Sequence, residues 1–235
     1  FAIDVKTGTV KWQWKPENVG FFKNFGVSAN RGVAVGDGKV FVMSLDMHIY
    51  AIDQQTGKLV NDLKIWDIVP EAKPEFGYYE SSAPVYYNGN VYFGVSGSDN
   101  GVRGFFMAAK AADLSPAWPD PFWTIPPDGQ DWRKQGANHG GGAPWMPGTI
   151  DPETNVLYFV TGNPSPDFFG EVRPGNNPNT NSIVAANAAT GAQIWVAQTI
   201  GHDLWDYDMA APPVLMMATV DGKQRKVVAE GSKGG

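Results

Sequence analysis

The stretch at residues 202–208 reads H-D-L-W-D-Y-D and carries three carboxylates among two aromatic side chains. An acidic turn of this kind most often faces water without any further role. Upstream, Asn163 follows the apolar run 156–160, so its amide is expected at the end of a strand, where a loop can present oxygen ligands. Carboxylate and amide oxygens together favour a hard cation such as calcium.

The elements that must position these residues are indicated by an internal repeat. The segment F-A-I-D-V-K-T-G-T-V-K-W at residues 1–12 returns in altered form at 50–59 and 184–195, and a degenerate copy runs from 107 to 118. Each copy predicts a short strand, a turn at Thr-Gly or its equivalent, and a second strand whose Trp or other apolar side chain packs on a neighbour. Further strands are expected at 40–43, 91–95 and 156–160, each after turn residues. Such short, repeated strands predict an all-β fold built of four-stranded blades, a β-propeller.

The composition restricts the class of partner. The chain has 235 residues, 43% hydrophobic and 18% charged, which is compatible with one large all-β domain or two ordinary ones. Its formal net charge of -6 argues against nucleic acid or an anionic membrane surface, because neither would be attracted. The absence of cysteine excludes a disulfide framework, a thiolate zinc site and a C-x-x-C-H haem attachment within these residues. A small-molecule partner is expected.

The chain begins and ends within repeats, without a recognisable signal peptide or membrane-spanning run. We expect it to be a segment of a longer protein that does not close a propeller alone, so that the remaining blades are required partners of its open strand edges. Three segments rich in Pro, Gly, Asn and aromatics, 67–79, 119–143 and 164–181, are expected to be long loops. Such loops carry function or merely cover the blades.

An ordered series of motifs resembles the quinoprotein dehydrogenases, which use pyrroloquinoline quinone (PQQ) and a bound metal to oxidise alcohols or sugars. The series is T-G-N-P-S-P-D from 161, V-R-P-G-N-N from 172, N-S-I-V from 181 and H-D-L-W-D-Y-D from 202. The resemblance implies an eight-bladed propeller of which residues 1–235 supply about half, or about four blades, without a second domain. It also implies a bacterial periplasmic enzyme, with possible membrane association through parts outside this chain, and an electron acceptor such as a cytochrome c or a quinone.

The resemblance assigns residues to the cofactor. PQQ is a flat, tricarboxylated ring, which needs an aromatic plate and cationic and hydroxyl donors. Trp145, after the run G-G-G-A-P, matches the family tryptophan that lies against the ring, the alternative being a tryptophan of the propeller core. Arg31 matches an arginine that contacts the cofactor, and Ser81 and Ser96 match hydroxyls near its carboxylates. The glycine run is not a phosphate-binding loop, because no Lys-Ser/Thr helix start follows it.

The resemblance also assigns the metal and the chemistry. Asp99 falls in the acidic ligand loop, where many members have Glu, and Asn163 matches the amide ligand. Asp206 matches the base that removes the hydroxyl proton while hydride passes to the quinone C5, whose carbonyl the metal polarises. Lys233 falls where many members carry Arg and would donate to the quinone oxygen; the alternative is a solvent-exposed lysine.

Asp208 bears on the identity of the metal. It follows Asp206 by two residues, so in an extended loop both side chains would face the same way. An acid here adds a metal ligand in lanthanide-using members, but the sugar branch also carries one. Lys233 would oppose a larger cation by its positive charge, so Ca2+ is favoured and a lanthanide is the alternative. Asp208 would then be either an indirect partner of the metal or a hydrogen-bond acceptor for Lys233. Many alcohol-oxidising members have adjacent cysteines where this chain has Phe25 and Gly26, which favours a sugar or polyol substrate.

The sequence therefore predicts a PQQ- and metal-dependent dehydrogenase acting on an alcohol, polyol or sugar hydroxyl. Two alternatives come from other classes: a non-catalytic propeller scaffold of the outer-membrane assembly type, which shares the repeat, and a glycan-binding propeller with aromatic loops. Neither alternative requires Asp99, Asn163, Asp206 and Lys233 together.

Overall fold

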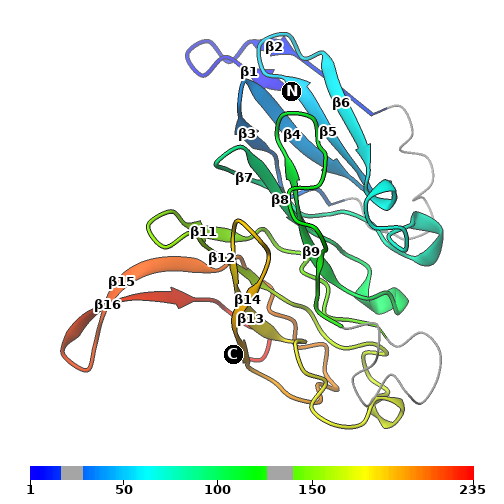
Figure 1. The fold of residues 1–235 in the computed structure, drawn as a ribbon, viewed down its shortest axis with the longest axis vertical. Coiled ribbons are helices and arrows are strands. Elements are labelled where there is room, and N and C mark those ends of the chain that lie inside the picture. Colours follow the sequence, from blue (N-terminus) through cyan, green and yellow to red (C-terminus); the bar gives the residue numbers. More distant parts are fainter. Residues whose placement is uncertain (17–28, 126–139) are drawn as a thin grey trace.

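The computed structural model describes residues 1–16, 29–125 and 140–235. These residues form a succession of antiparallel sheets, arranged side by side like the ribs of a fan (Figure 1). In each sheet the strands that follow one another in the sequence are neighbours. The sheets consist of β1 (Ala2–Ile3) and β2 (Val10–Trp12); β3 (Ala34–Gly36), β4 (Lys39–Ser44), β5 (His48–Asp53) and β6 (Leu59–Lys64); β7 (Val85–Tyr87), β8 (Asn90–Gly94), β9 (Phe105–Lys110) and β10 (Phe122–Trp123); β11 (Thr149–Asp151), β12 (Val156–Val160), β13 (Ser182–Asn187) and β14 (Gln193–Gln198); and β15 (Val214–Val220) and β16 (Lys223–Ala229).

The repeated D-x-x-T-G turn has a local cause. The Asp53 carboxylate accepts hydrogen bonds from the backbone N–H of Thr56 at 2.7 Å and from its hydroxyl at 2.7 Å. Asp4 receives the same two bonds from Thr7. Side chains of this type stabilise a turn by bonding to backbone a few residues on. The turn is therefore built into each copy of the repeat.

The tryptophan of the repeat joins one sheet to the next. Trp12 lies on Gly57, where an added Cβ would come within 2.7 Å of the ring, and its indole N–H donates to the carbonyl of Gln54 at 3.0 Å. Trp118 lies in the same way on Gly191 and donates to the carbonyl of Ala188 at 2.9 Å. Each ring thus packs on the Thr-Gly turn of the following sheet.

Aromatic side chains fill the space between the sheets. Phe106 on β9 stacks on Phe159 on β12 with ring centroids 4.5 Å apart, and both are buried. Phe41 on β4 is parallel to the ring of Tyr86 on β7 at 6.2 Å. These contacts belong to one hydrophobic core that continues from sheet to sheet.

The predicted all-β fold of four-stranded blades is confirmed, and the three expected strands correspond to β4, β8 and β12, although β8 ends at Gly94, one residue earlier than expected. One expectation was wrong: β10 lies inside 119–143, taken as a loop, because a two-residue strand flanked by prolines leaves no alternation to read. The rest of that loop, at 126–139, and the pair Phe25 and Gly26 lie outside the described residues. In the described part, no helix is long and apolar enough to cross a membrane.

Candidate functional site

The predicted site residues lie at one edge of the row of sheets because of the strand topology. In an antiparallel pair, the residue before the first strand and the residue after the second lie at the same edge. This rule places together Ser81 and Ser96 on either side of β7–β8, Trp145 and Asn163 on either side of β11–β12, and Asp208 and Lys233 on either side of β15–β16. The last two are bonded through the backbone, because the N–H of Lys233 donates to the carbonyl of Asp208 at 3.0 Å.

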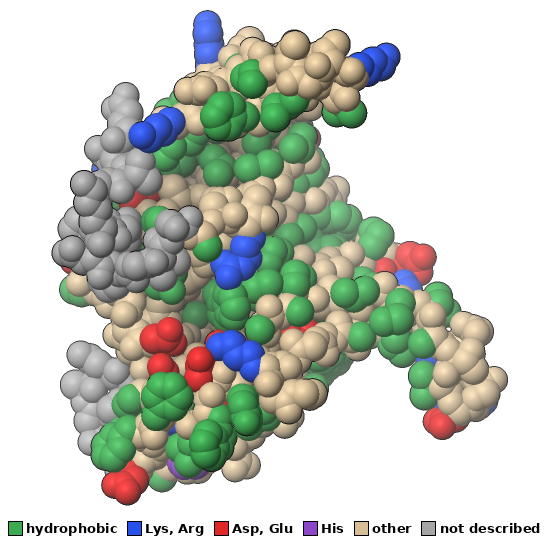
Figure 2. All heavy atoms as spheres, turned by 180° about the vertical axis from the view of Figure 1, so that it is seen from behind, with side chains coloured by type: hydrophobic (Ala, Val, Ile, Leu, Met, Phe, Trp, Pro, Cys, Tyr) green, Lys and Arg blue, Asp and Glu red, His purple; other side chains and the backbone are tan. Residues whose placement is uncertain are grey.

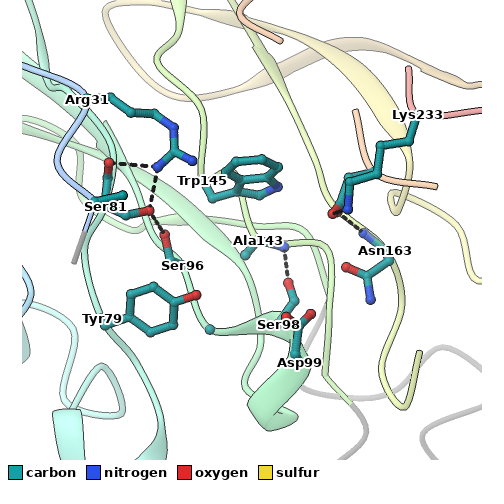
Figure 3. Close-up of a pocket in the computed structure, with 13 residues that line it drawn as sticks. Arg31, Tyr79, Ser81, Ser96, Ser98, Asp99, Ala143, Trp145, Asn163 and Lys233 are labelled. Carbon is teal, nitrogen blue, oxygen red and sulfur yellow. Dashed lines mark hydrogen bonds and ion pairs between the residues drawn. The ribbon is translucent and has the colours of Figure 1, made fainter. Parts of the chain in front are cut away.

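The loops at this edge enclose a pocket of about 210 Å³ (Figure 3). Its walls contain, from the sequence prediction, Arg31, Ser81, Ser96, Asp99, Trp145, Asn163, Asp208 and Lys233, and in addition Ala29, Tyr79, Gly97, Ser98 and Ala143. Asp206 is not in these walls but contacts them through Lys233, whose Nζ lies 3.0 Å from Asp206 Oδ2. All the predicted residues therefore gather around one pocket.

One part of the pocket is formed by Arg31, Ser81 and Ser96, and we call it the serine–arginine side. Arg31 Nη1 donates to the carbonyl of Ser81 at 2.9 Å and to its hydroxyl at 2.8 Å. The two serine hydroxyls lie 2.8 Å apart and bond to each other. The guanidinium carbon of Arg31 lies 4.6 Å from the centre of the Trp145 ring. A planar cation, two hydroxyls and an aromatic face thus line the same wall.

The opposite part contains Asp99, Asp208 and Lys233, and the carboxylates of Asp167 and Asp206 lie next to these wall residues. We call these five residues the acidic side. Asp208 is almost fully buried; its Oδ2 accepts from Lys233 Nζ at 2.7 Å and its Oδ1 accepts from the backbone N–H of Asn163 at 2.7 Å. Lys233 is thereby held between two acids, Asp206 and Asp208.

Two local backbone features allow the carboxylates of Asp206 and Asp208 to reach Lys233. Gly162 has no side chain to obstruct Asp208, since an added Cβ would fall 2.3 Å from its Oδ1. Asp206 has a φ of 61°, in the left-handed region. The expectation that Asp206 and Asp208 lie on the same face of an extended loop was therefore wrong, because the chain is not extended at Asp206. Both carboxylates reach Lys233 through this turn instead.

The carboxylates of the acidic side disfavour one another's charge. Burial raises the pKa of Asp99, and the neighbouring Asp206 raises it further, although the residue still opens onto the solvent of the pocket. Burial raises the pKa of Asp167 to about 6, with Asp99 and Asp206 adding to the effect. Burial likewise raises the pKa of Asp208 to about 6, against the favourable contact with Lys233. Like charges gathered in a partly dry site are a setting that a bound cation relieves.

The donor set fits a hard cation only in part. Within residues 1–16, 29–125 and 140–235, no three His, Asp or Glu side chains converge closely enough to hold a metal ion by themselves. Asp99 and the Asn163 amide face the same space in the pocket (Figure 3). The Asn163 Nδ2 donates to Asp167 Oδ1 at 2.7 Å, which leaves the amide oxygen as the available ligand atom. A cation here would take carboxylate and amide oxygens and complete its shell from a bound molecule.

Sequence reasoning missed several residues of the site. Asp167 ends the quoted motif T-G-N-P-S-P-D, yet it was not recognised as a partner of Asn163. Ser98 accepts the backbone N–H of Ala143 at 2.7 Å and so ties the Asp99 loop to the Trp145 loop. Glu80 is fully buried between two pocket residues, and neither of its carboxyl oxygens has a hydrogen-bond partner. A lone Glu between Tyr and Ser gives no sequence signal for this placement.

Exposed aromatic side chains adjoin the acidic side. Trp205 precedes Asp206 and is 70% exposed, and Phe168, after Asp167, is 71% exposed. In Figure 2 hydrophobic side chains lie next to acidic ones on the same face. Exposed apolar groups beside polar ones are typical of ligand-binding and interaction surfaces.

Comparisons with known proteins agree with this fold. The family described as "Glucose/ethanol/alcohol dehydrogenase, beta-propeller domain" matches residues 1–235. The fold class is thus that of a β-propeller. The chain belongs to the quinoprotein alcohol and sugar dehydrogenase family, which confirms the resemblance seen in the motifs.

Individual relatives give the extent of the match. The chain is 34% identical to "Quinohemoprotein alcohol dehydrogenase ADH-IIG" of Pseudomonas putida, covering 100% of this chain and 34% of that protein. Quinohemoprotein alcohol dehydrogenase from Comamonas testosteroni superposes with a TM-score of 0.85 at 30% identity, over 98% of this chain and 36% of that one. A europium-containing methanol dehydrogenase superposes with a TM-score of 0.81 at 26% identity, over 98% and 43%. The chain thus spans about a third of the length of its curated relatives.

Proposed function

We propose that this chain contributes most of the cofactor pocket of a PQQ- and metal-dependent dehydrogenase that oxidises a hydroxyl group. The observation that carries the proposal is the joining, in one pocket, of an aromatic face, a paired arginine and serine set and an acidic side with one lysine. A scaffold or a glycan-binding propeller has no requirement for this combination.

The serine–arginine side is suited to an anionic, planar group. Arg31 offers a planar fork of donors, which binds carboxylates in two-point fashion. The hydroxyls of Ser81 and Ser96 can each turn a donor toward the pocket, because a hydroxyl both donates and accepts. Trp145 offers its ring face in the same wall. These residues would hold PQQ by its carboxylates and its plane.

When bound, PQQ would supply a carbonyl carbon able to accept hydride, and a divalent cation would polarise that carbonyl. Asp206 acts as the base: its Oδ2 is occupied by Lys233, and its Oδ1 is left to take the hydroxyl proton of the substrate as the carbon loses hydride. Lys233, held between two carboxylates, donates toward the oxygen that gains charge.

We assign Asp99 and the Asn163 oxygen as metal ligands, and Asp206 as a further ligand on the same side. Both Asp208 oxygens are engaged by protein donors, one by the N–H of Asn163 and one by Lys233. This favours Asp208 as the partner of Lys233 rather than as a ligand, and hence Ca2+ rather than a lanthanide.

The relatives support an alcohol as the substrate class, since their names state alcohol dehydrogenases. A polyol or sugar stays within the proposal because of Lys233. Trp205 and Phe168, exposed next to Asp206 and Asp167, would cover the carbon skeleton. We further propose a bacterial periplasmic location and a cytochrome c or quinone as the acceptor of electrons.

The test uses the full-length protein, loaded with PQQ and CaCl2 after removal of bound metal. PQQ binding is followed by absorbance, and turnover by reduction of an artificial dye with a panel of alcohols, polyols and sugars. Saturable PQQ binding that depends on the metal, with turnover of at least one hydroxyl substrate, is expected. Absence of PQQ binding would leave the scaffold as the better explanation, and sugar binding without PQQ would favour the glycan-binding propeller.

A further inference from the structure

Arg173, in the motif V-R-P-G-N-N, is fully buried although it carries a charge. Its Nε donates to the carbonyl of Pro166 at 2.9 Å, and its Nη2 donates to the carbonyls of Asp167, at 2.8 Å, and of Asp203. Its Nη1 donates to Asn177 Oδ1 at 2.7 Å. The guanidinium is thus satisfied by neutral oxygens from three different stretches of chain.

Two of those stretches lead directly to site residues. Pro166 and Asp167 close the loop that begins at Asn163, and the Asp167 carboxylate orients the Asn163 amide. Asp203 opens the loop that carries Asp206 and Asp208. Arg173 therefore connects the loop of the amide to the loop of the base by direct hydrogen bonds.

Asp203 extends this connection along the base loop. Its Oδ1 accepts the backbone N–H of Trp205 at 2.8 Å, and its Oδ2 accepts the N–H of Tyr207 at 2.7 Å. The two bonds fix the backbone on both sides of Asp206. Asn181, from the motif N-S-I-V, donates its Nδ2 to the same Oδ2 at 2.8 Å.

We propose that Arg173 is a positioning residue that fixes the distance between Asn163 and Asp206, with Asp203 as its extension into the base loop. The inference rests on the proposed function, because Arg173 acts only through Asn163 and Asp206, whose own roles are proposed above. It gives a role to two motifs, V-R-P-G-N-N and N-S-I-V, whose residues are absent from the pocket walls.

Only arginine suits this place. Four acceptors surround the guanidinium in fixed directions, and its planar fork carries five N–H donors. Lysine offers three donors at one point and leaves at least one buried carbonyl without a partner. The loops would then lose their common anchor while the positive charge is kept.

The experiment uses the full-length enzyme and Arg173→Lys, with Arg103→Lys as the matched control. Arg103 is also buried, but it pairs with Glu71, and neither residue lines the pocket. Amide hydrogen exchange is measured by segment, calcium affinity by titration of the apoenzyme, and kcat and KM with the best substrate. For Arg173→Lys we expect faster exchange at 163–167 and 203–208, and calcium affinity and kcat each lower by roughly 10- to 100-fold, as is typical for groups that orient metal ligands.

Arg103→Lys should leave the exchange of segment 203–208 unchanged. Wild-type exchange, calcium affinity and kcat in Arg173→Lys would overturn the proposal, as would equal acceleration of 203–208 in both variants. If Arg173→Lys does not fold, Asp203→Asn decides instead: faster exchange at Trp205 and Tyr207 with a lower kcat supports the proposal, and wild-type values overturn it. A wild-type enzyme that binds neither PQQ nor calcium would refute the proposed function, whereas the exchange comparison would still judge Arg173.

Discussion

The two sides of the pocket are organised in opposite ways. On the serine–arginine side, donors and acceptors satisfy one another: Arg31 bonds to Ser81, and Ser81 bonds to Ser96. On the acidic side, four carboxylates accompany one lysine, which pairs with Asp206 and Asp208, and burial with mutual repulsion raises the pKa of Asp167 and of Asp208 to about 6. The first side has its geometry before any ligand arrives.

The acidic side, in contrast, has an excess of negative charge that its own lysine does not balance. A group of acids kept together against repulsion has a cost in stability, and folds retain such groups mainly at functional sites. The comparison therefore predicts different responses to mutation: loss of function without loss of structure on the acidic side, and loss of cofactor affinity on the serine–arginine side.

The largest effect is expected from Asp206→Asn in the full-length enzyme. An amide cannot take the hydroxyl proton, so turnover should fall by roughly 10²- to 10⁴-fold. PQQ should remain bound, because Asp206 is not in the pocket walls and asparagine keeps a side-chain oxygen for the cation. The measurement is dye-linked turnover together with the absorbance of bound PQQ. Retention of more than about a tenth of wild-type turnover would contradict the assignment of the base.

Arg31→Lys tests the serine–arginine side. Lysine keeps the charge but not the planar fork that donates to both Ser81 oxygens. PQQ affinity should fall roughly tenfold to a hundredfold, as for the loss of hydrogen bonds to a charged group, and kcat at saturating PQQ should change little. Titration of apoenzyme with PQQ measures this. Unchanged affinity together with a lower kcat would reverse the roles given to the two sides.

Asp208→Ala tests whether the acid serves the lysine or the metal. With calcium, the loss of the 2.7 Å contact to Lys233 should lower kcat by about tenfold, within the range for groups that orient active residues. The apoenzyme is refilled with calcium or with lanthanum, for wild type and variant in parallel. Activity with lanthanum alone, lost in the variant, would instead make Asp208 a metal ligand.

The smallest effect is expected from Glu80→Gln, which lies behind Arg31. Burial raises the pKa of Glu80 well above its ordinary range, although the positive charge of Arg31 opposes this shift. The folded state then keeps a proton that the unfolded chain releases above about pH 4. Its contribution to stability is thus fully present below the ordinary carboxyl pKa and is lost as the pH rises toward the raised value.

Glutamine is neutral at every pH and removes this dependence. Wild type should therefore lose stability relative to Glu80→Gln as the pH rises above about 4, the ordinary carboxyl pKa, measured by urea unfolding of the full-length apoenzyme. Exposed Glu75→Gln is the control and should follow wild type. Parallel curves for wild type and Glu80→Gln would show that Glu80 is not protonated in the folded protein.

The blades were predictable because their information is local and repeated. The Asp53 and Thr56 turn and the packing of Trp12 are set by residues close in the sequence or recurring with it. The strand β10 was missed because its place in the sheet comes from pairing with β9, not from its own two residues.

The site was predictable as a set of residues but not as a set of contacts. Motif order identified Asp99, Asn163 and Lys233, and topology alone then places them at one edge. The role of Asp208 toward Lys233 depends on the bare backbone of Gly162, and that of Arg173 on the meeting of three loops. Contacts between residues far apart in the chain produce no periodic pattern in a single sequence.

Trp118 and Gly191 lie at the edge of the sheets opposite to the pocket, since β13 starts near Asn163 and ends shortly before this turn. The ring leaves no room for one more carbon, because a Cβ at Gly191 would fall 2.6 Å from it. An alanine at position 191 would therefore force the β7–β10 sheet and the β11–β14 sheet apart at this edge. Such a displacement is expected to change the distance between the Ser96 and Asn163 loops, and with it the shape of the pocket at the other edge of the sheets.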